Sequence, residues 1–172
     1  MNIPLTPLRF LRYAEQQYSR RTAVVCNQDR FTYAEFADRA RRLAGALRQA
    51  GIQPGDRVAF LSTNCHRLLE AYYGVLEAGA VLLPLNIRLA PNELAYILND
   101  AGATILFVEK QLLGLVESFH KEIPSVKMIC LLEGTPEADW LSPRSYEDLL
   151  REAAPYRADI AAIDENGLAE LF

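Results

Sequence analysis

Residues 57–108 read RVAFLSTNCHRLLEAYYGVLEAGAVLLPLNIRLAPNELAYILNDAGATILFV. Three short apolar runs, at 57–62, 80–84 and 104–108, alternate with two segments whose apolar residues recur at helical spacing. Strands that alternate with helices are typical of βαβ units, which build a parallel sheet with helices on its faces. We therefore expect an α/β fold with a mainly parallel sheet and flanking helices.

Upstream of this stretch, the sequence predicts two helices and a hairpin. Thr6, which precedes a proline, is typical of the residue that caps the start of a helix. The β-branched run 22–26 and residues 31–33 predict two strands joined by a polar turn. Thr32 and Glu35 then form a capping-box pattern, which indicates the start of a longer helix.

Downstream, the sequence predicts in order a weaker helix at 112–121, a strand at 126–132 and a loop at 133–145. Ser145 and Asp148 have the spacing that starts a short final helix. We find no internal repeat, low-complexity tract or linker in the sequence. Residues 1–172 are therefore expected to form one domain.

The charge balance argues against a nucleic-acid partner. The chain has 18 Lys and Arg against 22 Asp and Glu, which gives a formal net charge of −4. The densest basic stretch contains Arg39 and Arg42, but Glu35 and Asp38 lie four residues before them. This order favours ion pairs within one helix, so we expect a self-neutralised, solvent-exposed helix face.

The sequence also indicates a compartment. No positively charged leader precedes an apolar segment, and the apolar run 78–85 is shorter than the ~18–20 residues that a membrane span needs. The chain has three cysteines, an odd number, and they are widely spaced at Cys26, Cys65 and Cys130. This pattern favours free thiols in a reducing compartment. We expect a cytoplasmic protein without a transmembrane segment.

Motifs that carry chemistry are not evident from the residues alone. The glycines form no dinucleotide-binding or P-loop pattern, and no serine occupies a nucleophile-elbow motif. His66 and His120 share no metal-ligand spacing with the cysteines. Cys65 and His66 are adjacent near a helix start, where neighbouring side chains diverge by about 100°. Composition and spacing therefore predict an α/β domain without a recognisable site.

Four segments, in this order, resemble the adenylate-forming superfamily of acyl-CoA synthetases, aryl-CoA ligases, luciferases and peptide-synthetase adenylation domains. They are FTYAEF (31–36), GIQPGDRVA (51–59), LEAGAVLLPLN (76–86) and ELAYILND (93–100). Each is a common local structure, but their order and spacing make the resemblance specific. It implies that the chain is part of the large N-terminal domain of such an enzyme.

The resemblance also implies what lies at the end of the sequence. In this family, a stretch like DENGLAELF (164–172) leads into a Ser/Thr/Gly-rich loop that wraps the phosphates of ATP. Residues 1–172 are therefore expected to be a single truncated subdomain that ends just before this loop. We expect it to be scaffold, inactive alone, with no catalytic residue and no metal ligand of its own.

For the intact enzyme, the resemblance implies an ATP-dependent acyl-CoA ligase. A carboxylic acid, expected to be a fatty acid, attacks the α-phosphate of ATP to give an acyl-adenylate and pyrophosphate, with Mg²⁺ offsetting phosphate charge. The thiol of coenzyme A then displaces AMP. ATP, Mg²⁺ and CoA are thus expected for the full-length enzyme, and none of them bound to residues 1–172.

One binding residue is carried over from the resemblance. In several CoA ligases, an arginine just after the Pro-Leu-Asn junction reaches the nucleotide phosphate of CoA, and the matching residue here is Arg88. Two alternatives are that Arg88 pairs with an acid such as Glu93 or stays in water.

Other functions stay open at this point. Within the enzyme class, the alternatives are an aryl-CoA ligase and an adenylation domain that serves a carrier protein. A different class is a complete, non-catalytic α/β binding module, which predicts a docked tail at 168–172. A ligase fragment predicts instead an apolar face or unpaired sheet edge, which could also drive formation of a homodimer.

Overall fold

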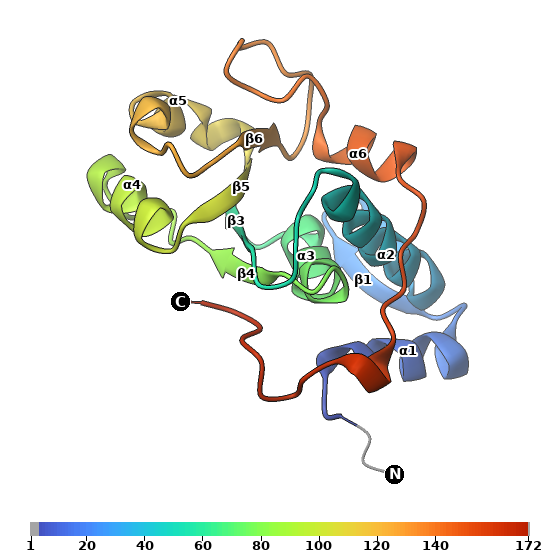
Figure 1. The fold of residues 1–172 in the computed structure, drawn as a ribbon. Coiled ribbons are helices and arrows are strands. Elements are labelled where there is room, and N and C mark those ends of the chain that lie inside the picture. The colour runs from blue at the N-terminus through green and yellow to red at the C-terminus, as the bar shows by residue number, and fades with distance from the viewer. Residues whose placement is uncertain (1–3, 172) are drawn as a thin grey trace.

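The computed structural model describes residues 4–171, which fold as an α/β unit (Figure 1). The main helices are α1 (Pro7–Tyr18), α2 (Tyr33–Gln49), α3 (His66–Glu77), α4 (Pro91–Asp100), α5 (Leu113–Glu117) and α6 (Tyr146–Glu152). The strands are β1 (Thr22–Cys26), β2 (Asp29–Thr32), β3 (Arg57–Leu61), β4 (Val81–Pro84), β5 (Ala103–Val108) and β6 (Met128–Leu131).

The main sheet is parallel and has the strand order β4-β3-β5-β6. The chain runs from β3 to β4 through α3, then returns across β3 to β5 through α4. Because right-handed crossovers in opposite directions place their helices on opposite faces, the sheet is covered on both sides. The predicted α/β fold with a mainly parallel sheet is confirmed.

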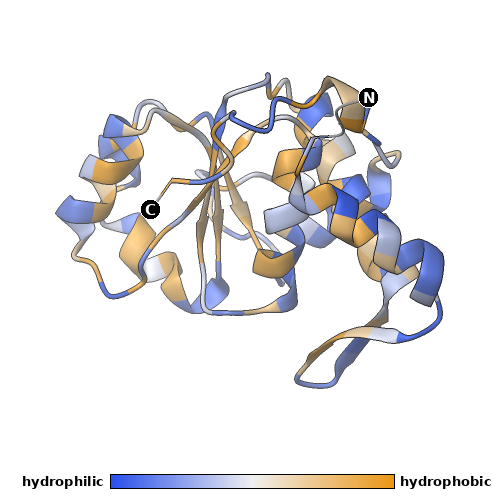
Figure 2. Cartoon of the chain, turned by 90° about the horizontal axis from the view of Figure 1, so that it is seen from below, coloured by the Kyte–Doolittle hydropathy of each residue, from blue (hydrophilic) through white to orange (hydrophobic). Residues whose placement is uncertain are grey.

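Two apolar cores lie on the two faces of this sheet (Figure 2). Phe60 and Phe107 face α2, α3 and α6, where their rings stack with centroids 4.6 Å apart. Leu61 and Leu106 point to the other face, against α4 and α5. This alternation follows from the two-residue period of a strand, and burial on both faces explains the continuous apolar runs.

The outlying elements follow their local signals. Thr6 caps α1 through a hydrogen bond from the Leu8 amide (3.4 Å), and Thr32 and Glu35 form the predicted capping box of α2. The hairpin turn is tighter than expected, because β2 begins at Asp29 and leaves only two residues in the turn. The weaker helix predicted at 112–121 shortens to α5, with 3₁₀ turns on either side.

The tail lies along the outer edge of β4. The Leu82 amide donates to the Ala169 carbonyl (3.0 Å), and the Leu171 amide donates to the Leu82 carbonyl (2.9 Å). These bonds form a single parallel bridge between Leu82 and Glu170, whereas Leu168 is 60% exposed. The docked tail that was expected of a binding module is therefore present at Leu82, whereas Leu168 stays exposed, and Phe172 lies outside the described residues.

No helix within residues 4–171 combines the length and the hydrophobicity that a bilayer crossing requires.

Candidate functional site at the carboxyl edge of the sheet

The carboxyl ends of the four parallel strands meet at one edge of the sheet. Ligands of open α/β sheets bind outside this edge, where successive crossovers leave in opposite directions. We call this place the switch point of the sheet. Here it lies between β3 and β5, because β3 connects toward β4 and β5 connects toward β6. The segments 62–65, 85–88 and 109–110 follow the strands at this edge and are the candidates for ligand contact.

At the switch point, polar groups are largely satisfied by each other. The Thr63 amide and hydroxyl donate to the Glu109 carboxylate at 2.7 and 3.0 Å, and the Glu109 amide donates to the Leu61 carbonyl at 3.0 Å. These bonds tie the end of β3 to the end of β5. The hydroxyl of Ser62 is buried and has no partner among residues 4–171. The switch point therefore offers a buried hydroxyl without a hydrogen-bond partner.

Arg88 lies on the turn that follows β4. Its amide donates to Asn86 Oδ1 (3.0 Å), and the Leu89 amide donates to the Asn86 carbonyl (3.2 Å), so Asn86 organises the turn. The side chain is exposed, and within residues 4–171 no carboxylate forms a salt bridge with it. Glu93 instead accepts a hydrogen bond from the Ala90 amide (2.8 Å) at the start of α4. In this structure Glu93 therefore caps α4 and does not form a salt bridge with Arg88.

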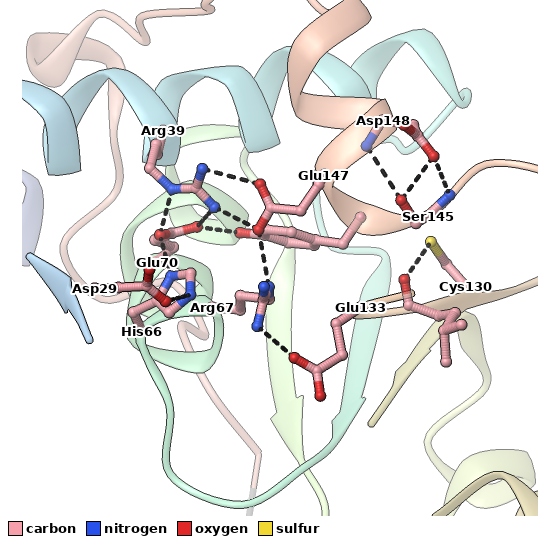
Figure 3. Close-up of polar contacts among 12 residues, drawn as sticks. Asp29, Arg39, His66, Arg67, Glu70, Cys130, Glu133, Ser145, Glu147 and Asp148 are labelled. Atoms are coloured by element: carbon pink, nitrogen blue, oxygen red, sulfur yellow. Dashed lines mark hydrogen bonds and ion pairs between the residues drawn. The ribbon is translucent and has the colours of Figure 1, made fainter. Parts of the chain in front are cut away.

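A second polar cluster is buried between α2, α3 and α6 (Figure 3). Its centre is Glu70, which has no exposed surface. The Glu70 carboxylate accepts hydrogen bonds from Arg39 Nε (2.7 Å) and the Tyr146 hydroxyl (2.7 Å), and it lies 2.9 Å from His66 Nδ1. Arg39 also forms two hydrogen bonds with Glu147, at 3.0 and 2.9 Å. Arg39 thus joins two carboxylates from two different helices.

The environment fixes the charges in this cluster. Burial alone would lower the pKa of Arg39, but its hydrogen bonds to Glu147 and Glu70 outweigh burial and raise that pKa. Burial works to raise the pKa of Glu147, yet Arg39 and Arg67 leave it below the ordinary value. The pKa of Tyr146 is raised well above its usual value, first by burial and then by Glu70. The cluster is therefore an ionic clamp in which Arg39 keeps its positive charge and Glu147 its negative charge at neutral pH.

This clamp corrects one prediction from the sequence. Glu35 does not pair with Arg39, because its carboxylate accepts from the Thr32 amide (2.8 Å) in the capping box. The expected exposed, self-neutralised face therefore holds for Asp38 and Arg42, which form the i,i+4 pair, but not for Arg39. One signal in the sequence does point to this clamp: Glu70 is a charge inside the apolar stripe of α3, and a buried charge requires a partner.

Groups with metal-binding or nucleophilic chemistry are dispersed. Within residues 4–171, no three His, Cys, Asp or Glu side chains are arranged to hold a metal ion. Cys130 is buried, which raises the pKa of its thiol to about 12, so it is not a nucleophile at neutral pH. Cys26 and Cys65 are partly exposed free thiols. No chemical step is assigned to a metal here.

Curated relatives place this geometry in a family of ligases. A long-chain-fatty-acid–CoA ligase of Thermus thermophilus is 45% identical over 125 residues, which cover 73% of this chain and 23% of the relative. A 4-hydroxybutyrate–CoA ligase of Metallosphaera sedula is 31% identical over 172 residues, which cover 98% of this chain and 31% of the relative. The chain therefore spans about a quarter to a third of the length of these relatives.

Solved structures agree with the sequence relatives. The structure described as a putative long-chain-fatty-acid CoA ligase from Rhodopseudomonas palustris superposes with a TM-score of 0.79 at 29% identity, covering 91% of this chain and 38% of that one. The AMP-binding enzyme family matches residues 10–164 of this chain. These residues include all six strands of the fold and all four segments that carried the resemblance. The chain belongs to the AMP-binding enzyme family, within its acyl-CoA ligases.

Proposed function

We propose that the protein to which residues 1–172 belong is an ATP-dependent acid–CoA ligase. It joins a carboxylic acid to AMP with release of pyrophosphate, and then transfers the acyl group from AMP to the thiol of CoA. The observation that carries this proposal is family membership across residues 10–164, together with relatives that are named CoA ligases. Mg²⁺ is proposed as the companion of ATP, and the cytoplasm as the compartment.

We propose a fatty acid as the substrate. The support is the fatty-acid–CoA ligase of Thermus thermophilus, which is 45% identical over the matched residues. A benzoate–CoA ligase of Arabidopsis thaliana is 39% identical over 120 residues, and this supports an aromatic acid as the second candidate. The two candidates differ in the shape of the acyl pocket, so a substrate panel separates them.

Within this activity, residues 1–172 are proposed to act as scaffold rather than as a catalyst. Their best-connected charges, Arg39, Glu70 and Glu147, are engaged with each other inside the fold. Arg88 is the proposed exception. It is exposed, it follows a strand at the carboxyl edge, and a guanidinium there can form a charge-assisted hydrogen bond with a phosphate of CoA.

The test uses the full-length protein and the 172-residue chain side by side. With ATP, Mg²⁺, CoA and a panel of long-chain, 4-hydroxy and aromatic acids, the full-length protein is expected to release AMP and to form one thioester, detected by mass spectrometry. Residues 1–172 alone are expected to form no thioester and to give no heat of ATP binding in calorimetry. Failure of the full-length protein with every acid would overturn the ligase proposal and favour a binding module.

Activity of the short chain would overturn the scaffold proposal by itself. Micromolar, Mg²⁺-dependent binding of ATP to residues 1–172 would do the same, because it would place the phosphate-binding groups within this chain. The same preparation also tests the proposed homodimer, since size-exclusion chromatography with light scattering reports the mass of the full-length protein in solution.

A further inference from the structure

A groove of about 300 Å³ lies between the end of β1 and the first turns of α3. Its walls are mainly apolar, from Val24, Val25, Leu68, Leu69 and Tyr72. Cys26 and Cys65 line the same groove, and both thiols are free and partly exposed. A concave apolar surface with few polar groups is the usual form of a small-molecule site. Here the groups that line the groove also include two free thiols.

His66 supplies an independent sign that a ligand belongs in this groove. The side chain lines the groove and is only 3% exposed. Its Nδ1 lies 2.9 Å from the Glu70 carboxylate (Figure 3). Its Nε2 has no hydrogen-bond partner among residues 4–171. A carboxylate oxygen of Asp29 lies 3.8 Å from this Nε2. Buried polar atoms without a partner are rare in folded proteins, so a polar atom of a ligand could complete this one.

Cys65 is placed where a reacting carbonyl would be stabilised. It is the N-cap residue of the twelve-residue helix α3, and its side chain makes no capping hydrogen bond. The first amides of α3 therefore lack the side-chain partner that Ser, Thr, Asp or Asn would provide at this position. Amides at a helix start carry partial positive charge, which stabilises an oxyanion that forms beside them.

We propose that this groove binds the acyl group of an apolar acyl thioester and that Cys65 accepts that group by thiol exchange. The Cys65 thiol loses its proton to solvent, and its sulfur attacks the thioester carbonyl carbon. The bond from that carbon to the original sulfur then breaks, and the departing thiolate takes up a proton. The product is S-acylated Cys65 and a free thiol, with no net oxidation or reduction.

Acyl-CoA as the natural donor rests on the proposed ligase function, because that reaction makes acyl thioesters. The site itself can be tested without it, since the thioester is added from outside. If the full-length protein had no ligase activity, acylation of Cys65 by an added thioester would still support the site. If Cys65 were not acylated, the ligase proposal would still stand.

The test compares octanoyl-CoA and acetyl-CoA on the folded 172-residue chain. Intact mass spectrometry is expected to show one octanoyl group, which peptide mapping places on Cys65 and neutral hydroxylamine removes. The octanoyl transfer is expected to be at least about tenfold faster than the acetyl transfer, because the longer chain buries additional methylenes in the groove. In urea-unfolded protein this preference is expected to disappear.

Four variants sharpen the assignment. Cys65→Ser is expected to abolish the adduct and Cys26→Ser to retain it. Leu69→Asn, which changes a half-exposed wall residue, is expected to bring the octanoyl rate close to the acetyl rate. Tyr96→Asn is the matched control, because Tyr96 is an exposed apolar residue on α4 that does not line the groove. It is expected to leave both rates unchanged.

Three results would overturn the proposal. They are an adduct mapped to Cys26 or Cys130, equal rates for octanoyl-CoA and acetyl-CoA in the folded chain, and an octanoyl preference that survives unfolding. The last result would show that the chain-length preference does not come from the folded groove. Cys130 serves as an internal negative control, because burial raises the pKa of its thiol to about 12.

Discussion

The hydroxyl of Tyr146 donates a 2.7 Å hydrogen bond to the carboxylate of Glu70, although 76 residues separate them in the chain. Both side chains are fully buried. The bond fastens α6, which follows a long loop, to α3, which covers the sheet. Several expected properties of the protein depend on this contact and on the ion pairs around it.

Removal of the hydroxyl tests the contact directly. Tyr146→Phe leaves one lone pair of a buried carboxylate without its donor, so we expect the free energy of unfolding to fall by about 1–3 kcal/mol. Urea unfolding followed by circular dichroism measures this change. Tyr96→Phe is the matched control, since Tyr96 is 68% exposed and its substitution is expected to be neutral. Equal stability of the two variants would contradict a stabilising role for the bond.

The ion pair between Arg39 and Glu70 is expected to show strong coupling. Arg39→Met leaves the Glu70 charge buried without its cation, so a loss of about 3–5 kcal/mol in unfolding free energy is expected. The double variant with Glu70→Leu removes both charges and should be less destabilised than the sum of the two single variants. Additive losses in urea unfolding would mean that the pair contributes no coupling energy.

Acid should weaken the clamp through Glu147. Hydrogen bonds and charge from Arg39 and Arg67 hold its folded pKa below the ordinary value despite burial. A depressed folded pKa contributes stability above the unfolded pKa, and that stability is lost as the pH falls through the folded value. The loss is therefore expected below about pH 4.

The glutamine variant isolates this contribution. Glu147→Gln is expected to be less stable than the parent at pH 7 and to lose less stability between pH 5 and pH 3. Unfolding in urea at fixed pH values measures both differences. Parallel stability curves for the two proteins across this range would show that Glu147 does not cause the acid sensitivity.

Two glycines on helices are expected to respond in opposite ways to alanine. A Cβ on Gly45 of α2 would lie 2.0 Å from the Ala154 carbonyl oxygen, and backbone cannot yield as a side chain can. Gly45→Ala is therefore expected to cost more than about 2 kcal/mol. Gly114 of α5 has nothing within 4 Å of its Cβ position, so Gly114→Ala should be neutral or stabilising by up to about 1 kcal/mol. Thermal melts of both variants make the comparison.

Local signals explain why so much of the fold could be predicted from the sequence. The capping boxes at Thr32 and Ser145 occur where expected, because each involves groups only three residues apart. The continuous apolar strands followed from burial on both faces of the sheet. The predicted helix at 112–121 is longer than α5, because apolar spacing alone does not distinguish an α-helix from the 3₁₀ turns that flank α5.

The buried clamp could not be predicted in the same way. The two carboxylates that bind Arg39 lie 31 and 108 residues away in the sequence, and packing decides which helix faces meet. Local spacing therefore assigned Arg39 to Glu35, whereas the fold pairs it with Glu70 and Glu147. The position of Arg88 came from a family resemblance, and the structure adds that its side chain is exposed and forms no salt bridge within residues 4–171.

The proposed CoA contact predicts a kinetic signature for Arg88 in the full-length protein. Arg88→Ala removes a charge that would meet a phosphate of CoA, whereas in the proposed two-step reaction the adenylate forms before CoA is used. We expect the apparent KM for CoA to rise by about tenfold, the equivalent of one charge-assisted hydrogen bond, with ATP–pyrophosphate exchange unchanged.

Two further variants separate charge from geometry at this position. Arg88→Lys keeps the charge but loses the planar fork, so an intermediate KM for CoA is expected. Arg20→Ala is the matched control, because Arg20 is also exposed and forms no salt bridge among residues 4–171. It should leave the KM for CoA unchanged. A parental CoA dependence in Arg88→Ala would remove Arg88 from the CoA site, because a surface arginine that stays in water can be lost without effect.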